Sequence, residues 1–140
     1  MSSLLLAQLA PAVDGIRLTI HVIAATVWVG GQITIAGLLP TVRSLGSDAS
    51  RKVARAFSRL SWPAYFVLVA TGIWNVAAVH AGQPHSWQIL LGIKIAVVAL
   101  AGSAAWLHGI ASSRTALSTW GAIMAGSSIA ALVMGVFLAG

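Results

Sequence analysis

The sequence contains no cysteine and very few charged residues. Of its 140 residues, 7% are charged, and the only acids are Asp14 and Asp48. The absence of cysteine excludes disulfide bonds, thiolate metal sites and cysteine nucleophiles. Two isolated acids exclude catalysis by paired carboxylates, and the chain has no serine triad pattern, phosphate-binding loop or HExxH motif. Any redox or transfer chemistry would therefore depend on a bound metal or cofactor.

Long apolar runs are what the chain has in abundance. Hydrophobic residues make up 59% of it, and the mean hydropathy is +0.94, whereas soluble domains carry about 25% charged residues. A helix needs roughly 20 apolar residues to cross a bilayer core of about 30 Å. We predict such helices over about residues 15–39, 61–80, 86–109 and 115–139. The expected fold is all-α, an integral membrane four-helix bundle that forms one domain over residues 1–140.

Local signals suggest where these helices begin and end. Asp14 is the expected N-cap of the first helix and Pro40 its stop, because aspartate favours N-caps and proline ends helices. Ser86 is the expected N-cap of the third helix. Residues 1–12 are expected to form an interfacial lead-in to the first helix, since they lack the basic region of a signal peptide.

The positive charges predict an orientation in the membrane. The net charge of +6 comes from residues between the apolar runs, which is a topology signal and not a nucleic-acid footprint. Because basic loops stay in the cytoplasm, we expect both termini outside, in a multi-pass protein of the cytoplasmic membrane. Arg51, Arg55 and Arg59 recur every four residues, which predicts a short basic helix on the anionic lipid surface within residues 43–59. The basic residues of the two inner connections are Arg43, Arg51, Lys52, Arg55, Arg59 and Arg114.

Nitrogen- and sulfur-bearing side chains gather in the predicted outer half of the bundle. Ionisable groups inside a membrane are costly to bury and therefore indicate functional sites. Each also has a simpler interpretation: an interhelical hydrogen bond for His21, a stem stretched to the surface for Lys94, solvated loop positions for the other two histidines, and core packing for the methionine. The group comprises His21, Asn75, His80, His85, Lys94 and Met134.

Two further residues extend this candidate site. Trp28 lies seven residues after His21 and hence on nearly the same helix face. Arg17 lies one turn before His21, and its simplest partner is Asp14 in an ion pair at the outer surface. We therefore consider His21, Lys94, Trp28 and Arg17 as candidate cofactor-binding residues. His21, His80, His85 and Met134 are the candidate metal ligands.

Three stretches resemble known membrane families. "HVIAATVWVGG", "RAFSRLSWPAYFVLVATGIWNV" and "WQILLGIKIAVV" are similar to the copper resistance protein D family, over roughly residues 16–110. The same stretches resemble the four-helix protoporphyrinogen oxidase of the haem pathway, which shares a helix-one histidine, a PA-containing second helix and a helix-three lysine. That second resemblance implies haem b, with His21 as a candidate axial ligand and Lys94 near the porphyrin. Typical copper resistance D proteins are larger, which implies a homodimer or a partner membrane or periplasmic protein.

These observations predict a membrane protein of the copper resistance D type that handles a redox metal at the outer face. In the copper version, His21, His80 or His85, and Met134 hold the ion, because imidazole and thioether suit Cu(I). The alternative is a haem b protein that exchanges electrons with a quinone or a porphyrinogen, and only this version would be an oxidoreductase. A structural or assembly subunit without a cofactor is the third possibility.

Overall fold

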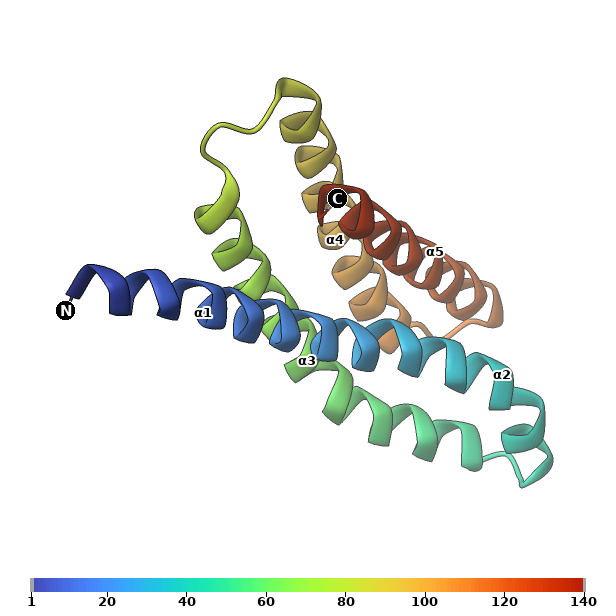
Figure 1. Cartoon of the computed structure of the whole chain (residues 1–140). Coiled ribbons are helices and arrows are strands. Elements are labelled where there is room, and N and C mark those ends of the chain that lie inside the picture. The colour runs from blue at the N-terminus through green and yellow to red at the C-terminus, as the bar shows by residue number, and fades with distance from the viewer. Residues whose placement is uncertain (1, 140) are drawn as a thin grey trace.

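The computed structural model describes the backbone of residues 2–139 and the side chains of residues 11–139. Every regular element in this range is helical (Figure 1), as the sequence predicts. The elements are α1 (Ser2–Ala25), the π-helical turn η1 (Thr26–Gly30), α2 (Gly31–Ser44), α3 (Ala49–Val79), α4 (His85–Ile110) and α5 (Arg114–Ala139). Together they provide four helical spans that are long and apolar enough to cross a membrane.

The first span is longer than expected at both ends. α1, η1 and α2 continue end to end as one rod (Figure 1), so the helix starts at Ser2 and not at Gly15. Asp14 lies inside α1, where it pairs with Arg17 one turn later at 2.9 Å. A pair at this spacing stabilises a helix interior, so Asp14 does not act as an N-cap. Pro40 lies inside α2, as prolines can in membrane helices.

The second span also begins earlier than predicted. α3 starts at Ala49, so Arg51, Arg55 and Arg59 belong to its first turns and not to a separate surface helix. The turn before α3 contains Gly46, whose φ of +123° lies in a region that favours glycine.

The remaining two helices match the predicted ranges closely. α5 starts at Arg114, one residue before the predicted start, and ends at Ala139. α4 starts at His85 after Pro84, so Ser86 is a helical residue and not the N-cap.

The helices pair into two antiparallel hairpins. The rod formed by α1, η1 and α2 packs along α3, while α4 packs along α5 (Figure 1). η1 contacts both α3 and α5, so it lies where the hairpins meet. Its Trp28 ring is 4.8 Å from the ring of Tyr65 and 6.0 Å from that of Trp62, between centroids. All three rings belong to the first hairpin, so this aromatic cluster packs η1 against α3.

The interior contains mostly small side chains, and large apolar side chains point outward. Ala101 and Ala104 are 2% and 0% exposed, whereas Phe137 and Val136 are 72% and 65% exposed. In water such a surface would be unfavourable, but lipid covers it without cost. Small residues at the contacts let helix backbones approach closely. This is the architecture of a multi-pass membrane protein.

A glycine on α4 is required for contact with α3. A Cβ at Gly102 would collide with the Tyr65 hydroxyl, which donates a hydrogen bond to the Val98 carbonyl at 2.9 Å. We expect Gly102→Ala to lower the free energy of unfolding by about 1–3 kcal/mol, as overpacking does. Gly92→Ala on the same helix is the control, because a Cβ there meets nothing within 4 Å. Thermal unfolding in detergent should separate the two variants, and equal melting temperatures would refute the contact.

Candidate functional site around His21

The ring of His21 is oriented by a hydrogen bond to the neighbouring helix. His21 on α1 and Thr71 on α3 face each other, with Nδ1 2.7 Å from the threonine Oγ1. That hydroxyl also donates to the Val67 carbonyl at 2.7 Å. A hydroxyl has one proton and a carbonyl can only accept, so Thr71 Oγ1 accepts from His21 Nδ1–H. In the neutral ring the lone pair is therefore on Nε2.

The surroundings leave this lone pair available. Among residues 11–139, His21 Nε2 has no hydrogen-bond partner. Gly72 follows Thr71 and lies beside the ring: a Cβ at that position would be 3.7 Å from His21 Cε1. The glycine thus leaves open the space that a larger residue would fill. A histidine whose Nδ1 is held by a hydrogen bond while Nε2 stays free has the arrangement of a metal ligand.

Lys94 contributes a basic group from the other hairpin. Its side chain is half-buried and lies against α5, since a Cβ at Gly135 would be 3.0 Å from Nζ. It is the only lysine or arginine in α4. Lys94 is therefore the cation that α4 can offer to a ligand.

Arg17 brings a positive charge near His21, and it is buried. It is 4% exposed and binds Asp14 Oδ1, so the expected ion pair is present, but only its acidic partner lies at the surface. The buried Arg17 Nε has no hydrogen-bond partner among residues 11–139, and neither has the buried Asn75 Oδ1. Arg17 lies four residues before His21 on α1, and Asn75 lies four residues after Thr71 on α3. Because the two helices are antiparallel, Arg17 and Asn75 lie at the same height along the bundle.

Trp28, one of the predicted cofactor-binding residues, forms a hydrogen bond between the two hairpins. Its indole N–H donates to Ser128 Oγ on α5 at 3.0 Å, and Gln32 Nε2 donates to the same oxygen at 3.3 Å. The ring is 4% exposed within the aromatic cluster. Trp28 therefore joins the two hairpins, and its only polar group is already engaged.

The other histidines predicted as metal ligands form no cluster with His21 in the described part of the chain. His80 and His85 are both exposed, at the end of α3 and the start of α4. Thr71 and His80 are nine residues apart on one helix, a rise of about 14 Å, which explains their separation. In the part of the chain with described side chains, no group of three or more His, Cys, Asp or Glu residues could hold a metal ion. Met134 is half-buried on α5, next to the glycine that Lys94 covers.

Several residues of the site were not predicted. Thr71 lies in one of the stretches that carry the family resemblance but was given no role, and no role was predicted for Gln32, Tyr65 or Ser128. Gln32 and Ser128 did carry a signal, because polar residues inside apolar helices must find partners. No pattern in the sequence indicates that Tyr65 would bond the Val98 carbonyl.

No protein-family model, curated protein or solved structure matches the chain. The site must therefore be interpreted from its own residues.

Proposed function

We propose that the chain binds haem b at His21 and serves as a membrane electron-transfer protein. The observation that carries this proposal is the hydrogen bond from His21 Nδ1 to Thr71, which leaves Nε2 as a free ligand atom in an apolar environment. Haem needs only one or two such axial ligands. Copper bound by protein side chains alone needs two or three soft ligands together, and among the residues with described side chains no group of three or more His, Cys, Asp or Glu is placed to hold a metal.

The basic side chains of the candidate site also favour haem b, because its carboxylates are negatively charged. Haem b carries two carboxylates on a flat apolar ring. Lys94 supplies a positive charge. Arg17 binds Asp14 through one guanidinium nitrogen, and its Nε–H has no partner among residues 11–139. Both can pair with carboxylates, and such pairs are strong where water is scarce.

In this proposal each residue has a separate task. His21 Nε2 holds the iron, and Thr71 fixes the ring orientation and makes the nitrogen more basic. Lys94 and Arg17 neutralise the carboxylates and thereby fix the position of the ring. When bound, the haem supplies one-electron chemistry. The surrounding helices exclude water, because the apolar side chains of all four spans lie in lipid.

The proposed orientation places this site in the outer half of the cytoplasmic membrane, with both termini outside. The basic first turns of α3, with Arg51, Arg55 and Arg59, support this orientation, because positively charged ends stay in the cytoplasm. His21 lies at the opposite half of the bundle, since it pairs with the C-terminal half of α3.

An absorption spectrum of the purified protein tests the proposal. We expect protein purified in a mild detergent to show a Soret band, either as isolated or after titration with haem b, at about one haem per chain. The control is the same detergent with haem and no protein. Failure to bind added haem would refute the proposal. Retention of stoichiometric copper in a colourless protein would favour the copper version instead.

A further inference from the structure

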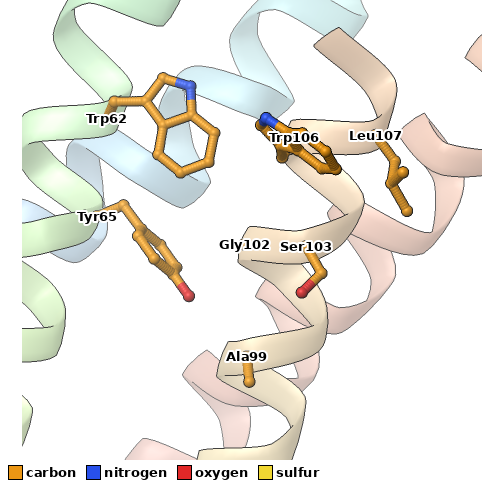
Figure 2. Close-up of a pocket in the computed structure, with 7 residues that line it drawn as sticks. All are labelled: Trp62, Tyr65, Ala99, Gly102, Ser103, Trp106 and Leu107. Carbon is orange, nitrogen blue, oxygen red and sulfur yellow. The ribbon is translucent and has the colours of Figure 1, made fainter. Parts of the chain in front are cut away.

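A groove between the two hairpins has the shape and the hydrogen-bond donors of a quinone site. It has a volume of about 530 Å³, which lies within the usual range of ligand pockets. It lies between α3 and α4 and is open toward the surroundings of the helices (Figure 2). Its lining residues are Trp62, Tyr65, Ala99, Gly102, Ser103, Trp106 and Leu107.

Aromatic rings form the walls of this groove and small residues form its floor. Trp62 and Tyr65 project from α3, and Trp106 projects from α4 toward them (Figure 2). The tyrosine is fixed in place, because its hydroxyl donates to the Val98 carbonyl and lies directly against Gly102. A flat ring can stack between such walls. A bulky or branched group could not stack on both aromatic walls in this way.

The polar groups that face the groove are mainly unengaged donors. In Figure 2 the indole nitrogens of Trp62 and Trp106 face each other, and the Ser103 hydroxyl points toward the tyrosine. Among residues 11–139, neither indole N–H has a hydrogen-bond acceptor within the protein. Indole N–H groups can only donate. These two groups are therefore free to donate to the acceptor oxygens of a ligand in the groove.

Together these features specify the ligand. We propose that the groove binds the head group of a lipid-soluble quinone. A quinone ring is flat, it carries carbonyl oxygens that only accept, and its isoprenoid tail is soluble in the bilayer. An acyl chain would fill the volume but offers no acceptor to the indole donors. The groove and the His21 site share no residue, so this inference stands whether or not the proposed haem binds.

The experiment uses the full chain in detergent micelles, titrated with decylubiquinone while tryptophan fluorescence is recorded. Binding to the groove gives a saturable quenching component, whereas partitioning into micelles gives a linear one. Trp106→Phe keeps an aromatic wall and removes one donor, so we expect binding about fivefold to tenfold weaker. Trp74→Phe is the matched control: Trp74 lies on α3 outside the groove and is 45% exposed, against 59% for Trp106. Its saturable component should keep the native affinity.

Two results would overturn the proposal. One is purely linear quenching in the native protein. The other is a saturable component that decylbenzene, which lacks carbonyls, displaces as well as decylubiquinone does, since the groove would then recognise only shape. If Trp106→Phe proves unstable, Ser103→Ala removes another donor from an exposed position. Unchanged affinity in every groove variant that folds would equally reject the donor argument.

Discussion

Replacing His21 by alanine should replace the Soret band of protein-bound haem by the spectrum of haem in detergent alone. The variant removes the only free imidazole nitrogen that the structure presents inside the bundle, at a site where Thr71 holds the ring from the opposite side. Loss of an axial ligand in an apolar site leaves the iron without protein coordination there. Absorption spectra at equal haem and protein concentrations measure the effect.

Thr71→Val separates a ligand role from a packing role. Valine keeps the shape of threonine but cannot accept the Nδ1–H bond. We expect the variant to keep its fold and to bind haem about 10-fold to 100-fold more weakly, as when other outer partners of metal ligands are removed. Haem titration measures the affinity.

The control for both variants is His108→Ala. His108 lies in the last turn of α4, where Nδ1 bonds the Leu117 carbonyl at 2.9 Å. Its removal should leave the spectrum unchanged. A native Soret band in His21→Ala, with only a lower melting temperature, would mean that His21 merely links α1 to α3.

Trp28→Ala should cost about 3–5 kcal/mol of stability, as expected for a large aromatic side chain removed from a packed interior. Trp28 combines three contributions: the hydrogen bond to Ser128, the contact with Tyr65 and the contact with Trp62. The hydrogen bond crosses to α5 in the second hairpin, and the two ring contacts pack η1 against α3. The variant should therefore also loosen the hairpins from each other.

Thermal unfolding by circular dichroism, compared with Trp74→Ala, measures this effect. Trp74 is 45% exposed on α3, so its loss should lower stability far less. Trp28→Phe should fall between the two, because it keeps the ring contacts and loses the hydrogen bond, about 1 kcal/mol. Equal melting temperatures for Trp28→Ala and Trp74→Ala would show that the buried contacts of Trp28 do not contribute to stability.

The sequence allowed the number and position of the helices to be predicted, because apolar runs of membrane length are a strong signal. The two ends of the first span were wrong for a physical reason. Asp14 and Pro40 are end signals in soluble helices, but Asp14 pairs with Arg17 inside α1, and α2 continues through the proline. In lipid a broken helix would expose backbone groups, so helices continue through such residues.

The candidate site was predictable in its charged residues and not in its contacts. His21, Arg17 and Lys94 stood out because ionisable groups are rare in apolar helices. Which helix His21 would face could not be derived, because apolar helices offer many similar packing surfaces. The bond to Thr71 arises only when α1 and α3 pair. The same holds for the bond between Trp28 and Ser128, which are 100 residues apart.

The π-helical turn η1 makes the number of residues in the first rod as important as their identity. Arg17, Ala24, Trp28 and Gln32 are all buried, and the first and last of them are 15 residues apart. At 3.6 residues per turn, 15 residues exceed four turns by about 60°, so an uninterrupted α-helix would rotate one end of this set away from its partners. The wider turn at Thr26–Gly30 takes up that excess. Deletion of one residue before Trp28 in this turn would remove no side chain of either contact. It would nevertheless rotate His21 relative to Trp28, so that the His21–Thr71 and Trp28–Ser128 hydrogen bonds could not both form.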